Sequence, residues 1–180
     1  MDALKAIELR KSTRSYQPKP VEADKIEQLI AVANNAPKAG TLHISVVENT
    51  DVLKELNDAT LIAMKNSGVE FLMSRAALEG YQPLYGAPVL FLLTAPKDAP
   101  YNIATASCAA ANITIAATAL ALGSCYVISP LLGLDGKSEL SGKIGIPEEF
   151  SPVCGVLVGY SAGEAFSTPK SAAYSVNYCK

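Results

Sequence analysis

The sequence predicts a single domain that combines helices with buried strands, and three observations support this. Its 180 residues suit one domain with a sizeable core. Apolar residues recur at helical spacing in several segments, of which residues 26–33 are the clearest. Continuous apolar runs at Val89–Thr94 and Val153–Val158 are typical of strands that are covered on both faces. Since no repeat or low-complexity segment divides the chain, we expect one domain over residues 1–180.

Composition narrows the class of partner. The formal net charge of -2 argues against nucleic acid as the main ligand. Hydrophobic residues make up 49% and charged residues only 18% of the chain, with a mean hydropathy of +0.22. Such a low charge content suggests that a second copy of the chain buries part of the surface. Polar residues interrupt the longest apolar stretch, Ile103–Leu122, so we expect a buried helix there and no membrane span.

Cysteine and histidine usage argues against a metal centre. The single histidine is His43, and the cysteines contain no C-x-x-C pair, so no zinc site is predicted. A disulfide framework has no support at this length. A reducing cytoplasm fits best, and residues 1–5 show no secretory leader. Two of the four cysteines, Cys108 and Cys154, are expected to be small buried hydrophobic residues.

The N-terminal third is predicted to contain two helices and a strand. Asp2 can cap a first helix over residues 3–9, and Pro18 and Pro20 prevent helix continuation after the basic segment that follows. The next elements are expected to be a helix at residues 21–33, a loop at 34–41 and a strand at 43–48.

The remainder is expected to alternate between helices and strands. A helix at residues 51–67 should end at Gly68, and a short apolar helix with a turn at 69–84 could form a lid over a pocket or a dimer arm. An Ala-rich helix at 102–122 belongs at the centre of the molecule or at a subunit interface. The other predicted elements are strands at 89–94, 125–128 and 153–158, a short helix around 137–141, and an extended arm at 161–180 whose alternating end could pair with a partner's sheet.

A basic segment between the first two helices is the first candidate site. If its backbone is extended, Arg10, Ser12 and Arg14 project from one face, while Lys11 and Thr13 project from the other. Two guanidiniums and a hydroxyl on one face suit a phosphate group, because the planar fork of arginine matches phosphate oxygens. A solvated turn between two helices is the alternative interpretation.

Several motifs occur in order along almost the full chain. They are R-K-S-T-R after the first helix, A-P-K-A-G-T-L-H before a strand, Y-G-A-P-V-L-F-L-L as a second strand, A-L-G-S-C-Y after the Ala-rich helix, and V-C-G-V-L-V-G-Y near the end. Together they resemble the FMN-dependent nitroreductase family. The resemblance implies an α+β fold in three layers, with a mixed central sheet flanked by helices. It also implies an intertwined homodimer with two FMN molecules at the interface, each touched by both chains.

The resemblance also implies cofactor-binding residues. Lys38, Thr41 and His43 depart from the residues common in the family at their positions, which are Ser, Asn and Gln. The positions that match the family's FMN contacts are Arg10, Lys11, Ser12 and Arg14 for the phosphate, Pro37, Lys38, Ala39 and Thr41 for the ribityl chain and ring, Val127, Ile128 and Ser129 in the loop after the Ala-rich helix and its strand, and Lys170 as a C-terminal basic residue.

The implied activity is hydride transfer from NADH or NADPH through FMN to a nitroaromatic or quinone-type acceptor, in a ping-pong cycle. Such a cycle needs no side-chain nucleophile, only positive charge near the reduced flavin, which Lys38 or Arg14 could supply. Phe71, Tyr81 and Tyr85 could line the acceptor pocket. Two alternatives remain open: a flavin-binding protein for storage or sensing with little turnover, and an anion-binding scaffold without flavin.

Overall fold

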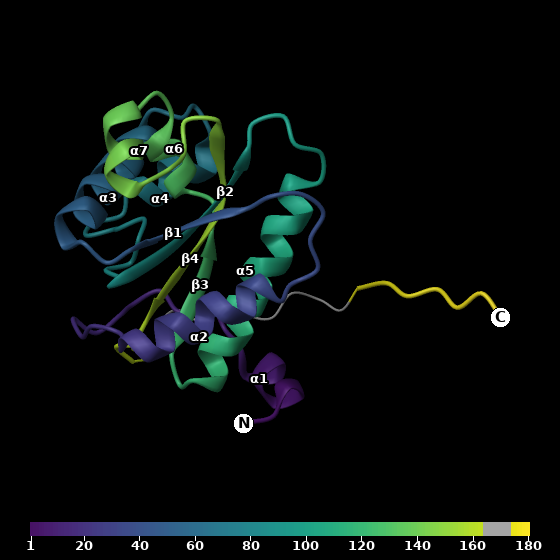
Figure 1. Cartoon of the computed structure of the whole chain (residues 1–180). Helices are drawn as coiled ribbons and strands as arrows, with labels where there is room; N and C mark the ends of the chain where they lie inside the picture. Colours follow the sequence, from purple (N-terminus) through teal and green to yellow (C-terminus); the bar gives the residue numbers. More distant parts are fainter. Residues whose placement is uncertain (164–173) are drawn as a thin grey trace.

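The structure, a computed structural model, describes residues 1–163 and 174–180 of the chain. Helices lie on both sides of a four-stranded sheet (Figure 1). The elements, in chain order, are α1 (Ala3–Leu9), α2 (Ala23–Asn34), β1 (His43–Val47), α3 (Thr50–Lys65), α4 (Glu70–Ala76), β2 (Val89–Pro96), α5 (Asn102–Ala119), β3 (Gly123–Val127), α6 (Pro130–Leu134), α7 (Ser138–Ile144) and β4 (Phe150–Gly159).

The sheet has the strand order β1-β2-β4-β3, and each neighbouring pair is antiparallel. The α+β class is therefore confirmed. The four strands form an antiparallel sheet, so the prediction of a mixed sheet is wrong for them. The reason lies in the connection through α5: β2 and β3 run in the same direction, and β4 is inserted between them in the opposite direction. Within the described residues, parallel pairing is limited to one isolated bridge between Ser12 and Ser124.

Alternate side chains of the central strands enter two separate cores. Phe91 and Val156 pack with α2 and α5 on one face, while Leu90 and Leu157 pack with α3, α6 and α7 on the other. All four of these side chains have 0% exposure, because β2 and β4 occupy the middle of the sheet. The three-layer arrangement is therefore confirmed, and it explains why these strands read as continuous apolar runs in the sequence.

The Ala-rich helix α5 packs against the sheet and against α1 and α2. Ala106, Ala110 and Ala117 are completely buried, which lets the helix backbone approach the sheet closely, whereas Ile103 near its start is 69% exposed. The helix ends three residues before its predicted end at Leu122. Ala121 adopts a left-handed conformation (φ 58°), and Leu122 N donates back to the Ala117 carbonyl, so the chain turns there toward β3.

Side-chain caps begin two of the predicted helices. The Asp2 carboxylate accepts from Lys5 N at the start of α1, as expected. At the start of α3 the Asn49 side chain accepts from Asp51 N and Val52 N, one residue earlier than the predicted start of the helix. Each cap satisfies backbone donors that have no partner within their own helix.

No helix in the described parts of the chain is long and apolar enough to cross a bilayer. Residues 174–180 have no regular secondary structure, and Tyr174, Val176 and Tyr178 are all exposed. The expected pairing of this arm with a partner's sheet stays a prediction, as does its assignment, with residues 1–160, to one domain.

Candidate functional site

The basic segment after α1 is extended and runs along the edge of the sheet. Thr13 N donates to the Ser124 carbonyl at 2.8 Å, and Ser12 forms the parallel bridge to Ser124 on β3. Further along, Tyr16 forms an antiparallel bridge with Ser161 just after β4. The predicted extended backbone is confirmed, because these bonds place the segment as a short extra strand beside β3.

Side chains of this segment alternate between two environments. Thr13 is 2% exposed and packs over Gly123, where an added Cβ would lie 2.6 Å from Thr13 Oγ1. Arg10, Ser12 and Arg14 are half-buried, as expected for residues on the opposite face of one strand. We call these three residues the phosphate cradle.

The buried thiol of Cys125 interacts with all three cradle residues. Burial raises the pKa of Cys125, while the positive charge of Arg14, a hydrogen bond from Ser12 and the positive charge of Arg10 all act to lower it. All three side chains therefore lie within electrostatic or hydrogen-bonding range of one thiol in β3. Lys11, which alternates with them, is exposed.

A cavity of about 1240 Å³ opens beside the phosphate cradle. Arg14 and Cys125 form its wall on the cradle side, and the chain leaving β3 continues that wall. The opposite wall comes from α4 and the turn that follows it. The first wall consists of Arg14, Cys125, Tyr126, Val127, Ile128, Ser129, Leu131 and Leu132. The second wall consists of Phe71, Leu72, Arg75, Leu78, Glu79, Gly80, Tyr81, Gln82 and Tyr85, with Met64 of α3.

The predicted segment Val127–Ser129 lies on this wall as a group. Val127 is buried at the end of β3, Ile128 is 59% exposed, and Ser129 immediately precedes α6, whose first residue is Pro130. Proline suits the first position of a helix, so the chain turns sharply here from strand to helix. This turn places three consecutive residues against the cavity and next to the cradle.

The second wall carries an aromatic group. Phe71, Tyr81 and Tyr85, which were predicted as pocket residues, all line the cavity. The rings of Tyr81 and Tyr85 meet edge to face at 6.0 Å, and the Arg75 guanidinium carbon lies 5.5 Å from the centre of the Tyr81 ring. Burial, followed by contact with Tyr85, raises the pKa of Tyr81 to about 12. Both Arg75 and Tyr81 are half-buried.

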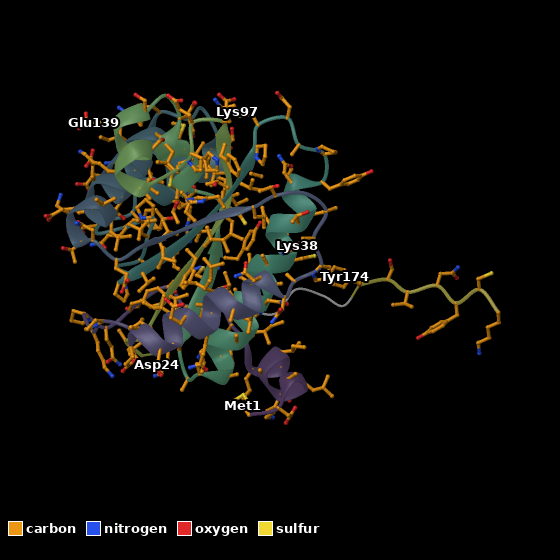
Figure 2. The ribbon with its side chains drawn as sticks, in the orientation of Figure 1. Met1, Asp24, Lys38, Lys97, Glu139 and Tyr174 are labelled. Atoms are coloured by element: carbon orange, nitrogen blue, oxygen red, sulfur yellow. The ribbon has the colours of Figure 1, made fainter. Side chains whose placement is uncertain are left out.

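The loop Pro37–Thr41 does not line this cavity. It is bound to α5 instead: Ala39 N donates to Thr105 Oγ1 at 3.2 Å, and the same hydroxyl donates to the Ala39 carbonyl. Figure 2 shows Lys38 exposed beside α5. The loop leads into β1, and β1 and β3 are opposite edges of the sheet, so two strands lie between β1 and the strand that the cradle segment pairs with.

Two other predicted residues lie elsewhere. His43 begins β1, is half-buried, and meets the Phe150 ring edge to face at 6.3 Å, so it packs against an aromatic side chain and does not line the cavity. Lys170, predicted as a C-terminal phosphate contact, lies outside the described residues.

Sequence reasoning missed two features of the site. The sequence predicts Cys125 only as part of a strand, although its alternation with Val127 places both residues on one face. No motif includes Arg75, although it is the third of only three arginines in the chain, the others being Arg10 and Arg14. In a weakly charged sequence, the arginines alone would have pointed to both walls of the cavity.

Comparison with known proteins identifies the family. The model of the nitroreductase family matches residues 7–160. The chain belongs to the nitroreductase family. A relative from Archaeoglobus fulgidus, named "Putative NADH dehydrogenase/NAD(P)H nitroreductase", is 29% identical over 175 residues, which cover 91% of this chain and 87% of that protein.

Solved structures of other nitroreductases share the fold. A nitroreductase from Bacteroides fragilis with bound FMN superposes with a TM-score of 0.87 at 28% identity, covering 100% of both chains. A nitroreductase from Desulfitobacterium hafniense, also with bound FMN, has a TM-score of 0.87 at 21% identity and the same coverage. The second comparison concerns the fold alone.

The residues of this nitroreductase-family chain fit a flavin nucleotide. The cavity exceeds the roughly 300–1,000 Å³ typical of ligand pockets, which leaves room for a cofactor and a second molecule. Its walls are mainly apolar and aromatic, and the phosphate cradle provides charge and a hydroxyl at one side. An apolar body with one anionic end is the shape and chemistry of FMN.

Proposed function

We propose that this protein is an FMN-dependent oxidoreductase that uses NADH or NADPH to reduce nitroaromatic or quinone-type acceptors. The observation that carries the proposal is that Arg10, Ser12 and Arg14 all act on the thiol of Cys125, which lines the large cavity together with Arg14. Membership of the nitroreductase family and the FMN bound in the Bacteroides fragilis protein support it.

In this proposal the phosphate cradle holds the terminal phosphate of FMN. The guanidiniums of Arg10 and Arg14 each present paired N–H donors that match phosphate oxygens, and the Ser12 hydroxyl donates a further hydrogen bond. The position of the group is fixed because Thr13, between Ser12 and Arg14, is buried over Gly123 and bonded to Ser124. A phosphate bound here gains charge-assisted hydrogen bonds without reorganisation of the segment.

The end of β3 and the turn after it would hold the flavin ring. Val127 ends β3, the strand that the cradle segment pairs with, and Ile128 and Ser129 follow it, so the three residues lie along the wall on the cradle side. The chemistry that FMN supplies when bound is hydride transfer from NAD(P)H to the acceptor in a ping-pong cycle. This chain contributes binding, orientation, exclusion of water and positive charge from Arg14 or Lys38.

We also propose that two copies assemble into a homodimer. Lys38 and its loop do not line the cavity, and the strand that they lead into, β1, is at the opposite edge of the sheet from β3, so one chain does not bring its own loop to its own cavity. Exposed apolar side chains on α1 and α5, Leu4 (80%), Ile7 (52%) and Ile103 (69%), offer a surface for a second copy. A second copy could then supply the loop.

Four free thiols support the cytoplasm as the compartment.

Two measurements on the purified protein test the function. Wild-type protein should bind FMN, lose its yellow colour when NADH or NADPH is added without oxygen, and regain it with a nitroaromatic or quinone. Arg14→Gln and Ser12→Ala should weaken FMN binding and leave riboflavin, which lacks the phosphate, less affected. Lys97→Gln, which removes an exposed charge away from the cavity, is the control.

Each outcome distinguishes the functions considered. Protein that takes up no FMN contradicts the proposal and leaves the anion-binding scaffold. Protein that binds FMN but is not reduced by either nucleotide is a storage or sensing protein. Equal losses for FMN and riboflavin would show that the cradle does not hold the phosphate.

A further inference from the structure

The charged side chains that line the cavity differ in how far they are buried. Three charged side chains line the cavity: Arg14 in the cradle, and Arg75 and Glu79 on the opposite wall. Arg75 is half-buried, whereas Glu79 is exposed. Within residues 1–163 and 174–180, no carboxylate lies within ion-pair distance of Arg75, and its recorded contact is with the ring and hydroxyl of Tyr81.

A half-buried guanidinium with an aromatic neighbour but no carboxylate favours an incoming anion. Partial burial removes part of its hydration, and a ring face compensates only in part. A carboxylate restores the lost interaction with two parallel hydrogen bonds, because its geometry matches the guanidinium fork. Arg75 is therefore the position on this wall where an anionic group is most favoured.

Two tyrosines beside Arg75 add hydrogen-bond donors. Tyr85 is held in a left-handed conformation (φ 54°), which is strained for a residue with a large side chain and is common where a side chain must be aimed at a site. Its ring meets Tyr81 edge to face, so the two phenols form one group with Arg75. The Tyr81 hydroxyl is hydrogen-bonded to both Tyr85 and Arg75, so the three polar groups are already linked to one another on this wall.

The rest of this wall suits an aromatic body. Phe71, Leu72, Leu78 and Leu132 line the same cavity with apolar side chains. We propose that Arg75, with Tyr81 and Tyr85, selects acceptors that carry a carboxylate on an aromatic ring. This inference rests on the proposed function, since it concerns the second molecule that occupies the same cavity.

The first experiment compares two acceptors that differ in charge. The specificity constant kcat/KM is measured for 4-nitrobenzoate and for its neutral analogue 4-nitrobenzamide, in wild-type protein, Arg75→Gln, Arg75→Lys and Lys97→Gln. Wild-type protein should prefer the carboxylate. Arg75→Gln should lower the benzoate-to-benzamide ratio by about 10-fold or more, the loss expected for a charge-assisted hydrogen bond. Arg75→Lys should keep part of the preference, and Lys97→Gln should keep all of it.

The second experiment needs no turnover. Benzoate and benzamide are titrated into the oxidised, FMN-loaded protein, and binding is followed by the change in the visible flavin spectrum. Benzoate should bind more tightly than benzamide to wild-type protein, and this difference should disappear in Arg75→Gln. Far-ultraviolet circular dichroism and the FMN content of each variant show whether it has folded.

The failures of the two proposals are distinguishable. Protein without FMN, or without reduction by NAD(P)H, overturns the proposed function. Wild-type protein that reduces 4-nitrobenzamide but shows no preference for the carboxylate overturns the role of Arg75 alone. An Arg75→Gln variant that raises KM for NADH and leaves the acceptor ratio unchanged also overturns it, because the anion recognised would then be the pyrophosphate of the nucleotide.

Discussion

Thr13 packs directly over Gly123, and this contact fixes the distance between the phosphate cradle and the edge strand β3. An added Cβ on Gly123 would meet the Thr13 side chain at 2.6–2.9 Å, closer than real Cβ contacts allow. Since Thr13 lies between Ser12 and Arg14, any displacement of it moves the two cradle residues beside it. A glycine is therefore required at position 123 by packing. Backbone conformation does not require it, because the φ angle of Gly123 is not in the left-handed region.

Replacement of Gly123 by alanine should weaken FMN binding without touching the cofactor. Overpacking of this kind costs about 1–3 kcal/mol, so we expect a lower midpoint of thermal unfolding and a larger dissociation constant for FMN. Gly142→Ala is the matched control, since nothing lies within 4 Å of a Cβ there. An unchanged FMN affinity in Gly123→Ala would show that the segment does not depend on this contact.

The exposed lysine on the α2–β1 loop should affect the rate of reduction. We expect Lys38→Ala to slow reduction of bound FMN by NAD(P)H more than it weakens FMN binding, because its charge would stabilise the reduced cofactor. Stopped-flow absorbance measures the first and fluorescence titration the second. Equal reduction rates in the variant and the wild type would remove Lys38 from the mechanism and leave Arg14 as the source of charge.

The exposed start of α5 should be part of a subunit interface. Ile103→Glu places a charge on a side chain that is 69% exposed in one chain, and we expect it to convert dimers to monomers in sedimentation velocity. Loss of FMN should accompany the dissociation. Ile62→Glu, at an isoleucine of α3 that is 61% exposed, should leave the dimer intact. A dimeric Ile103→Glu variant would mean that another surface forms the interface.

The junction between α2 and β4 should show a pH-dependent contribution to stability. The Tyr160 hydroxyl donates to the Glu22 carboxylate, and this hydrogen bond is the main reason that the pKa of Glu22 is lowered to about 2. A carboxyl whose pKa is lower in the folded protein stabilises it above its unfolded pKa, and this stabilisation is lost as the pH falls through the folded value.

Tyr160→Phe isolates this hydroxyl, because the ring that Lys19 covers is retained. The variant should unfold at a lower temperature than wild type at neutral pH, and the difference should shrink as the pH is lowered from about 4.5 toward 2. Tyr174→Phe, on a side chain that is 92% exposed, should show no difference at any pH. A Tyr160→Phe difference that is constant with pH would contradict the role of Glu22.

The sequence was most informative where the structure depends on local pattern. Alternation alone predicted that Arg10, Ser12 and Arg14 share a face, and the helical spacing at residues 26–33 correctly predicted α2. Direction within the sheet could not be obtained in this way, because it depends on β4 being inserted between β2 and β3. The position of Arg75 on the cavity wall likewise depends on how α4 packs against the rest of the chain.

The two groups of predicted cofactor residues also show that local pattern does not predict tertiary position. Resemblance to a family assigned both the cradle and the loop Pro37–Thr41 to FMN, but no sequence pattern indicated that they adjoin strands at opposite edges of one sheet. Their relative positions depend on the pairing of strands that are distant in the sequence. Phe71, Tyr81 and Tyr85 were predicted as possible pocket residues because a short apolar segment with a turn could form a lid, and all three line the cavity.

The separation of the loop at β1 from the cradle at β3 has a consequence for mixed assemblies. In a dimer of one Arg14→Gln chain and one Lys38→Ala chain, both defects would fall in one of the two sites, and the other site would be intact. Two preparations of reduced activity should therefore recover part of it after they are unfolded and refolded together, as in complementation between alleles of one gene. A site built within a single chain could show no such recovery.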